Sequence, residues 1–273
     1  EFLSGNEVPL FTLALTLPAQ QNLSVFAPFR VQSSDFRSVH ADESSTPERL
    51  QLHFADHPGA FGQDLHLSAN ATVFEGTDGL VHFQLSVHNA GPWAVQSALY
   101  PGLQQAATLA QPHDELLYPC FEGVVLPNPG THIGLTTPGH GMYPNGCPVQ
   151  VTARYGQDAG MYLATQDGSG MVKGFHLKNS MREWVRLDIL HYNTERVGAD
   201  FVVEYDTVVG TFGAGGWRTA AAMYKTWASR QTWCATKLSE RHDIPDILLS
   251  GAPGIISGIQ NEKGYSAAPR LGT

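Results

Sequence analysis

The sequence predicts a mainly β protein of antiparallel strands, with one helix near its C-terminal end. Two observations predict the strands: apolar and polar residues alternate along many short segments, and turns that contain glycine or proline separate these segments. A period of two places apolar side chains on one face of a sheet and polar side chains on the other. A third observation predicts the helix, because the apolar period changes to three and four residues after residue 216.

The N-terminal strands are expected in three short apolar segments, residues 10–17, 25–31 and 50–54. The polar segment 33–49 is expected to be a loop. The alternating segments 65–73 and 81–87 lie on either side of a turn that contains two glycines. Two such segments joined by a glycine-containing turn are typical of a β-hairpin.

The middle of the chain combines short strands with a long loop. Strands are expected at residues 95–99 and 116–126, the second interrupted by Pro119, and segment 101–115 fits a short helix or an excursion. Residues 127–148 are rich in Gly, Pro, Asn and Thr and are expected to form a loop. Long loops in compact domains often carry function.

Further strands are expected at residues 149–155, 161–165, 172–177, 185–191 and 201–209, with a tight turn at 167–170. Residues 216–232 are expected to form the longest helix. Its apolar stripe consists of Trp217, Ala220, Ala221, Tyr224, Trp227 and Ala228. A stripe with this spacing packs on a sheet, so Trp217, Tyr224 and Trp227 are expected to be largely buried.

The composition argues against two classes of partner. Charged residues make up 15% of the chain and the formal net charge is -9, whereas a nucleic-acid-binding surface is cationic. No run of about 18 apolar residues occurs, so no membrane span is expected. No signal peptide is visible, but a chain that begins at Glu1 could have lost one.

Two sequons, at Asn22 and Asn70, match the N-glycosylation acceptor pattern. Asn70 lies on the polar face of its predicted strand, where an enzyme could reach it. Such tripeptides also arise by chance, and they carry information only in a eukaryotic secreted protein. On this basis we expect a secreted or extracellular glycoprotein.

Three cysteines are too few for a disulfide framework, and none forms a CxxC pair. Cys120 and Cys147 could pair, in which case the bridge would contribute on the order of 3–4 kcal/mol by loop-closure entropy. Two buried free thiols are the competing interpretation. Cys234 follows the predicted helix and is expected in the core.

A string of short motifs resembles one known group of proteins. The motifs are Val87-His88-Asn89, Leu99-Tyr100-Pro101, Leu117-Tyr118-Pro119, Glu122-Gly123-Val124, Tyr143-Pro144, residues 160–167, Lys173, His191-Tyr192, residues 213–217, Ala221, Tyr224, Trp227, Trp233 and Asp243-Ile244-Pro245. Together they resemble the N-terminal domain of uncharacterised glycoside-hydrolase-like proteins. That domain is a galactose-mutarotase-like β-supersandwich that precedes a (β/α)8 catalytic barrel.

The resemblance implies a division of the chain and a role for its helix. Residues 1–212 would form the antiparallel β-supersandwich, and residues 213–250 would form a linker helix and the lead-in to the barrel. Residues 251–273 would be a Gly/Pro-rich tail or the start of a truncated barrel. Trp217, Tyr224 and Trp227 would then pack the two domains together.

No catalytic residue can be assigned, because the resemblance places the catalytic carboxylates on barrel strands. Within the chain, a pair of carboxylates suited to glycoside hydrolysis would come from Glu183, Asp188, Glu195, Asp200, Glu204 and Asp206. We interpret these mainly as a solvated sheet face. A mutarotase-like proton transfer would instead use His176, His191 and Glu204, without a motif that supports it.

No metal or cofactor is expected. His66, His82 and His88 alternate with apolar residues on paired strands and could share one face, but no HxH or HExxH spacing occurs. Their interpretation as polar surface is favoured.

Carbohydrate is the expected ligand. Aromatic rings near loops or strand ends could stack on sugar rings while polar neighbours bind hydroxyls. The candidates are Trp93, Tyr100, Tyr118, Tyr143 and Trp184, with core or rim packing as the alternative for each. We therefore expect an accessory domain of a secreted glycoside-hydrolase-like protein, with carbohydrate and a C-terminal barrel or other subunits as partners. The rival hypothesis is a stand-alone extracellular carbohydrate-binding or structural assembly protein.

Overall fold

The computed structural model describes residues 8–16, 29–42, 48–59, 64–109, 113–120, 123–131, 141–180, 183–193 and 197–237, together with residues 240, 242, 259–260 and 266–267. The chain divides into two compact units, residues 1–228 and residues 229–273. None of the described helices is long and apolar enough to cross a membrane.

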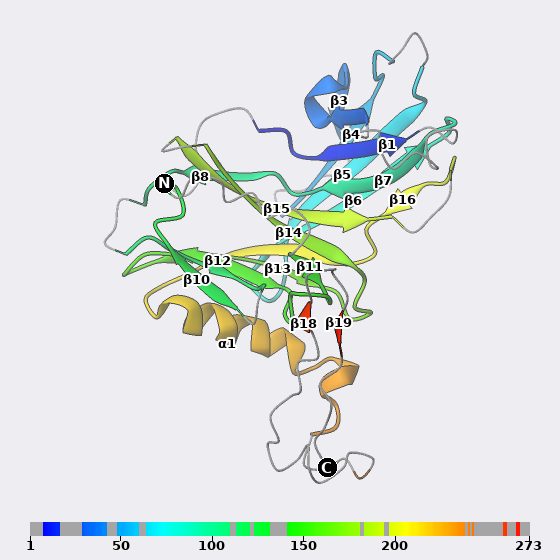
Figure 1. Ribbon diagram of the computed structural model, residues 1–273. Coiled ribbons are helices and arrows are strands. Elements are labelled where there is room, and N and C mark those ends of the chain that lie inside the picture. The colour runs from blue at the N-terminus through cyan, green and yellow to red at the C-terminus, as the bar shows by residue number, and fades with distance from the viewer. Residues whose placement is uncertain are drawn as a thin grey trace. The chain divides into compact units, whose positions relative to one another are not determined.

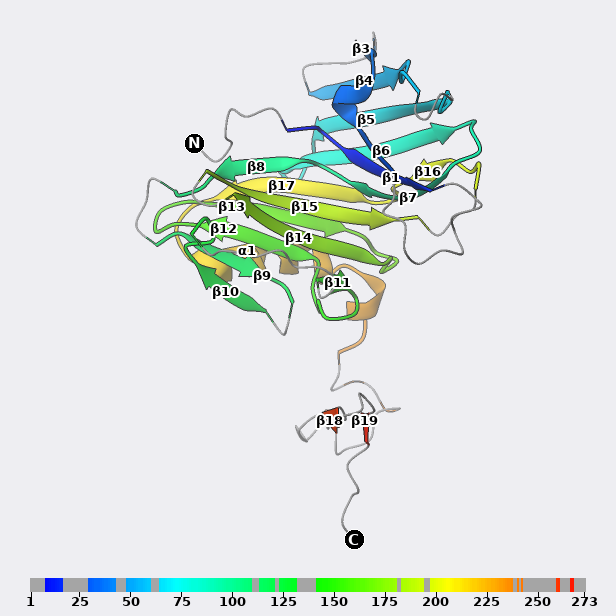
Figure 2. The ribbon, with the colours of Figure 1, turned by 45° about the horizontal axis from the view of Figure 1, so that its top comes forward.

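The first unit is an antiparallel β-sandwich with a C-terminal helix (Figures 1 and 2). One sheet has the strand order β11-β14-β15-β7-β1-β2, and β8 also pairs with β15. Its strands are β1 (Thr12–Thr16), β2 (Phe29–Gln32), β7 (Ala94–Leu99), β8 (Leu103–Ala106), β11 (Met142–Tyr143), β14 (Lys173–Ser180) and β15 (Trp184–Tyr192).

The other sheet has the order β10-β9-β12-β13-β17-β6-β5-β4-β3, and β16 also pairs with β6. Its strands are β3 (Ser38–Ala41), β4 (Arg49–Ala55), β5 (Leu67–Glu75), β6 (Val81–Asn89), β9 (Glu115–Tyr118), β10 (Val124–Pro127), β12 (Val151–Tyr155), β13 (Gly160–Gln166), β16 (Phe201–Val202) and β17 (Asp206–Phe212). Every pair of strands in both sheets is antiparallel, as predicted.

The alternation of the sequence determines which side chains lie between the sheets. On β15, Val185, Leu187 and Ile189 are buried in the core, and on β5, Leu67, Ala69 and Ala71 are buried in the same way. The intervening residues of each strand therefore project from the outer faces of the sandwich. The predicted hairpin is confirmed, because β5 pairs with β6 from Leu67 opposite Asn89 to Glu75 opposite Val81.

Four predicted segments differ in the structure, and one of them is the expected loop 127–148, which contains the short strand β11. The expected loop 33–49 contains a 3-10 turn (Ser33–Asp35) and the edge strand β3, and segment 101–115 contains the strand β8 rather than a helix. The predicted strand 201–209 is interrupted: β16 and β17 pair with the same strand β6 on either side of residues 203–205.

The helix α1 (Gly216–Ala228) covers the outer face of the ten-stranded sheet at β12 and β13 (Figure 1). Ala220 is fully buried, and the partly buried Met223 and Tyr224 pack against the same apolar cluster, which includes Tyr155 and Tyr162. The prediction for Trp217 was wrong, because its side chain is 42% exposed. The buried stripe is centred on Ala220 and Met223, so Trp217 lies at its margin.

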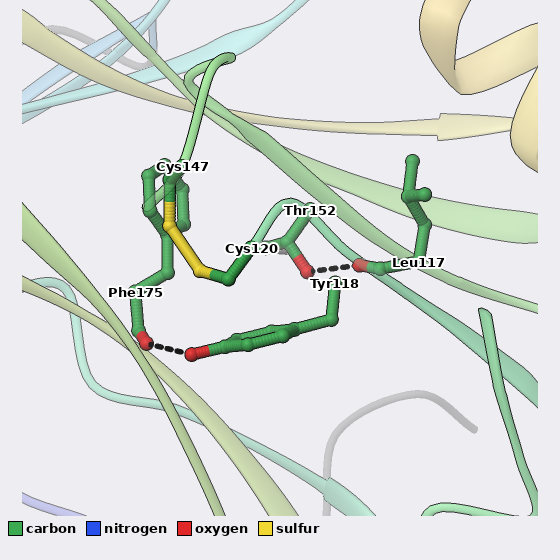
Figure 3. Close-up of a disulfide and its surroundings, with 6 residues drawn as sticks. All are labelled: Leu117, Tyr118, Cys120, Cys147, Thr152 and Phe175. Carbon is green, nitrogen blue, oxygen red and sulfur yellow. Dashed lines mark hydrogen bonds between the residues drawn. A yellow bond between two sulfur atoms is a disulfide. The ribbon is translucent and has the colours of Figure 1, made fainter. Parts of the chain in front are cut away.

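Cys120 and Cys147 form a disulfide, which resolves the two interpretations left by the sequence (Figure 3). Both cysteines are buried in the core beside Phe175. The Tyr118 hydroxyl donates to the Phe175 carbonyl oxygen at 3.0 Å, and the Thr152 hydroxyl donates to the Leu117 carbonyl oxygen at 2.7 Å. The bridge joins the segment after β9 to the segment between β11 and β12.

In the second unit, the described residues include a 3-10 turn (Thr232–Cys234) and a short strand pair, β18 (Ile259–Gln260) and β19 (Ser266–Ala267). Cys234 is exposed, contrary to its expected place in the core. The motif Asp243-Ile244-Pro245 lies outside the described residues.

Candidate functional site

A hollow of about 300 Å³ opens on the outer face of the ten-stranded sheet, and we call it the β6 groove. It is lined by Asn70, Thr72, Gln84, Leu85, Ser86, Val202, Val203, Glu204 and Asp206. The groove arises from an interruption in strand pairing. Val202 pairs with Ser86 and Thr207 pairs with Phe83, so residues 203–206 face only two residues of β6. The extra residues form a bulge that reshapes one wall of the groove.

The bulge is fixed by its inward-facing residues and by Asp206. The Val203 N–H donates to the Leu85 carbonyl oxygen at 3.0 Å, and the Tyr205 side chain is buried. The Asp206 carboxylate accepts a hydrogen bond from the Gln84 amide at 2.7 Å. Glu204 therefore projects outward from a segment that is held on both sides.

Glu204 has no hydrogen-bond or ion-pair partner among the described residues, and it is exposed. The hydroxyls of Thr72 and Ser86, which are half-buried and also line the groove, likewise have no hydrogen-bond partner among the described residues. Asn70 uses its side-chain oxygen for a 2.7 Å hydrogen bond with His53, which leaves its amide N–H groups available. The groove thus presents donors and an anionic acceptor that the fold itself does not use.

His82 lies at one end of the groove, between two carboxylates. Its Nδ1 is 2.7 Å from Asp206 Oδ2 and its Nε2 is 2.9 Å from Asp78 Oδ1, while its ring stacks on Phe74. Burial would lower the pKa of His82, but the two hydrogen bonds to carboxylates outweigh burial and raise that pKa above its usual value. The protonated ring can donate to both carboxylates, so it holds Asp206 in place.

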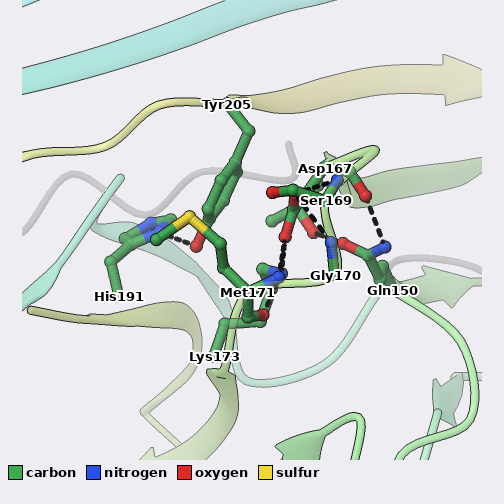
Figure 4. Close-up of polar contacts among 9 residues, drawn as sticks. Gln150, Asp167, Ser169, Gly170, Met171, Lys173, His191 and Tyr205 are labelled. Carbon is green, nitrogen blue, oxygen red and sulfur yellow. Dashed lines mark hydrogen bonds and ion pairs between the residues drawn. The ribbon is translucent and has the colours of Figure 1, made fainter. Parts of the chain in front are cut away.

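Beneath the groove, a chain of hydrogen bonds joins the bulge to the other sheet (Figure 4). Tyr205 contacts His191 of β15 through a 2.8 Å hydrogen bond, and the other ring nitrogen of His191 is 2.8 Å from the Tyr100 carbonyl oxygen. A carbonyl oxygen only accepts, so Nε2 carries the proton and Nδ1 accepts from the Tyr205 hydroxyl. The Tyr100 hydroxyl in turn donates to the Gln84 carbonyl oxygen at 3.0 Å, on the floor of the groove.

The Tyr205 ring also packs against the Lys173 ammonium of a buried ion pair. The Lys173 ammonium is 2.5 Å from Asp167 Oδ2 and 4.5 Å from the centre of the Tyr205 ring, and its side chain is fully buried. Asp167 accepts further hydrogen bonds from the backbone of Ser169, Gly170 and Met171 (Figure 4). Burial raises the pKa of Asp167, but the hydrogen bond from Lys173 and those from the turn outweigh burial and lower it. The pair therefore ties the end of β13 to the start of β14 in the opposite sheet.

The buried His191 predicts a loss of stability at acid pH. Burial lowers its pKa to about 4 from 6.5, so the unfolded chain binds more protons than the folded chain between these values. The stabilisation is complete above pH 6.5 and declines as the pH falls toward 4. We expect the stability difference between wild type and His191→Gln to shrink over this window by up to about 1.4 kcal/mol per pH unit. Urea unfolding at several pH values measures it.

His66→Asn is the matched control for this experiment, because it also removes a histidine, but one that is exposed at the surface. A His191→Gln variant whose pH profile runs parallel to that of wild type would contradict the prediction.

Most of the aromatic residues proposed for sugar stacking are in the core. Trp93, Tyr100 and Tyr118 are at most 4% exposed, so no ring face is open to a ligand, and these three predictions are corrected. Aromatic rings bury large areas, which favours the interior. Tyr143 is half-buried with Lys173 over its ring at 4.8 Å, and Trp184 is half-buried on β15. Neither lines the β6 groove.

The described candidate carboxylates are dispersed over the two sheets, except for Glu204 and Asp206, which both line the β6 groove. Asp188 is not a solvated residue, because its side chain is fully buried beside Arg186 at 2.7 Å, and burial raises its pKa. It projects from the outer face of the seven-stranded sheet, whereas Glu204 projects from the outer face of the ten-stranded sheet. Asp200 accepts from the Asn89 N–H, and Glu183 accepts from Ser180. Glu195 lies outside the described residues.

The histidines are also dispersed. His176 faces Asp188 across β14 and β15, and burial lowers its pKa to about 4. His191 lies on the opposite face of that sheet, so His176, His191 and Glu204 do not converge. His66 and His88 are exposed and His82 is buried. Among the described residues, no group of three or more His, Cys, Asp or Glu side chains could hold a metal ion.

Of the two sequons, Asn70 is exposed on β5 and Asn22 lies outside the described residues. The groove itself was not predicted. Its lining residues follow the pattern of an ordinary polar strand face, and the one available signal was the alternation of Glu204 and Asp206 with Val203 and Tyr205.

Comparisons with known proteins give a fold and a partial family match. Residues 201–266 match a family described as Domain of unknown function (DUF6259). No curated protein sequence gives a significant match. The structure is similar to the α-N-acetylgalactosaminidase NagBb from Bifidobacterium bifidum in its GalNAc complex, with a TM-score of 0.61 and 13% identity over 84% of this chain and 34% of that chain. A quadruple mutant of NagBb gives a TM-score of 0.60, 13% identity and the same coverage. The chain thus spans about a third of the length of these enzymes, and at this identity the similarity shows the fold alone.

Proposed function

We propose that this chain is the β-sandwich domain of a glycoside-hydrolase-like protein, in which it supports a separate catalytic domain and contacts glycan. The observation that carries the proposal is coverage: 84% of the chain aligns with only 34% of a glycoside hydrolase chain. The remaining two thirds of such an enzyme has no counterpart here.

The arrangement of carboxylates supports a non-catalytic role. Glycoside hydrolysis uses two carboxyl groups about 5–10 Å apart. Asp188 and Glu204 lie on opposite outer faces of the sandwich, and Asp206 is engaged by His82 and Gln84. Asp200 is held by Asn89. Of the two carboxylates that line the groove, Glu204 is thus the one without a partner among the residues that the structure describes.

The helix α1 supports a role in packing against a further domain. Trp217 leaves 42% of its surface exposed at the margin of the helix, where Arg218 lies over its ring. Exposed large aromatic side chains are characteristic of interfaces. We propose that Trp217, together with the half-buried Tyr224 and Trp227, contacts the catalytic domain. Since α1 and the β6 groove share the outer face of the ten-stranded sheet, glycan contact would occur on the side of that helix.

The disulfide supports a secreted or extracellular location. Structural disulfides persist in oxidising compartments, and the Cys120–Cys147 bridge is buried in the core.

The isolated chain is expected not to hydrolyse aryl glycosides or natural glycans, because Asp206, the second carboxylate of the groove beside Glu204, is already bound by His82 and Gln84. Release of nitrophenol from a panel of aryl α- and β-glycosides measures this. Turnover that is abolished by Glu204→Gln or Asp188→Asn would contradict the proposal and favour a stand-alone enzyme. The matched control is the Glu183→Gln variant, which removes a carboxylate that lies outside the groove.

A further inference from the structure

The β6 groove combines unused polar groups with an apolar margin. Counting only contacts within the described ranges, its free donors are the Asn70 amide and the hydroxyls of Thr72 and Ser86, and its free acceptor is the Glu204 carboxylate. Val202, at the rim, is 54% exposed and presents methyl groups beside these polar atoms. Polar groups at the surface bind water as readily as they bind a ligand. Whether the groove favours a ligand therefore depends on how these groups are arranged and how rigidly they are held.

The groove is rigid because both walls are fixed from inside. The Tyr100 hydroxyl binds the backbone of β6 on its floor, and Tyr205 and Asp206 hold the bulge that carries Glu204. A ligand that binds to Glu204 therefore restricts the rotation of that side chain, while the backbone that carries it is already fixed. Such preorganisation reduces the entropy lost on binding.

The charges of the groove select among ligand classes. Two carboxylates in one hollow repel a phosphate, a sulfate or an acidic sugar. A bound metal ion requires several free oxygen ligands, but both oxygens of Asp206 are occupied by His82 and Gln84. A neutral polyol fits, because adjacent hydroxyls can donate to one carboxylate while their oxygens accept from an amide and hydroxyls.

We infer that the β6 groove binds one neutral glycosyl unit of a glycan. Glu204 accepts hydrogen bonds from two adjacent sugar hydroxyls, and Asn70, Thr72 and Ser86 donate to sugar oxygens. Val202 contacts the C–H face of the ring. The volume of about 300 Å³ accommodates a single hexose. This inference rests on the proposed function for the class of ligand and on the groove for its position.

The test is an NMR titration of the isotopically labelled chain with neutral methyl glycosides of galactose, N-acetylgalactosamine, glucose and mannose at millimolar concentrations. Production in a bacterial periplasm allows the disulfide to form and keeps Asn70 unmodified. At least one probe is expected to shift the amide signals of residues 70–72, 84–86 and 202–206. Glu204→Gln is expected to weaken that binding about tenfold or more, because it removes the charge from the acceptor. Glu183→Gln, outside the groove, is expected to leave it unchanged.

Glu204 is exposed and has no partner in the described part of the chain, so the melting temperature of Glu204→Gln should equal that of wild type, and weakened binding would not reflect misfolding. No shift with any glycoside, shifts confined to other residues, or equal binding by Glu204→Gln would overturn the inference. A stronger response of the same signals to calcium ions alone would overturn it in favour of a cation site. None of these outcomes affects the proposed packing role, which depends on α1 and on the length of the native polypeptide.

Discussion

Asp167→Ala is expected to lower the free energy of unfolding by about 3–5 kcal/mol, because it leaves the buried Lys173 ammonium without its counter-ion. Lys173 is fully buried, and its other neighbours are the Met171 carbonyl oxygen and the rings of Tyr143 and Tyr205. None of these carries a negative charge. Thermal unfolding followed by circular dichroism should show a melting temperature lower by roughly 10 °C or more.

The double variant Asp167→Ala/Lys173→Met separates the charge from the lost hydrogen bonds. If the unpaired ammonium causes the loss, the double variant should recover much of the stability, because no buried charge remains. Equal destabilisation in the single and double variants would show that the turn contacts of Asp167, and not Lys173, are responsible.

Arg154→Met is expected to cost a similar amount, about 3–5 kcal/mol. The fully buried Arg154 guanidinium donates to both oxygens of Asp114, at 2.9 and 2.6 Å, and to the carbonyl oxygens of Ala106 and Ala107. Methionine fills much of the volume but leaves the Asp114 carboxylate with the Leu109 N–H as its remaining described donor. The contacts of Arg154 link β12 to the end of β8 in the other sheet, so equilibrium urea unfolding should report the loss.

The control is Arg218→Met, which removes an exposed guanidinium from the helix. Surface substitutions of this kind usually change stability by less than about 0.5 kcal/mol. Arg154→Lys tests the geometry, because an ammonium cannot reproduce the fork of the guanidinium. Stability close to wild type for Arg154→Met would contradict the structural role given to the pair.

The strands with one buried face were predictable because their pattern is local. The hairpin of β5 and β6 follows from alternating residues and a turn with two glycines, and it forms as predicted. The strand β3 was missed because its residues, Ser38 to Ala41, are mostly exposed at a sheet edge. The strand β8 was missed because Gln104 and Gln105 are polar yet buried, which only tertiary contacts explain.

The candidate site was less predictable because it depends on register. Glu204 and Asp206 follow the same alternation as any polar strand face, but their segment gains two residues relative to β6 and bulges. Several residues that were predicted to be accessible to a ligand or to solvent are buried in the structure. Tyr100 and Asp188 looked accessible in the sequence, whereas Tyr100 binds backbone beneath the groove and Asp188 is enclosed. Such outcomes arise from the pairing of distant strands, which no short window of sequence contains.

The length of the native polypeptide tests the central claim most directly. Intact mass spectrometry of the protein purified from its source measures that length. A domain of a glycoside-hydrolase-like protein predicts a native chain about two and a half times as long as this one, as the 84% and 34% coverages of this chain and of NagBb imply. A mature native chain of 29.6 kDa would contradict the claim and favour a stand-alone carbohydrate-binding or assembly protein.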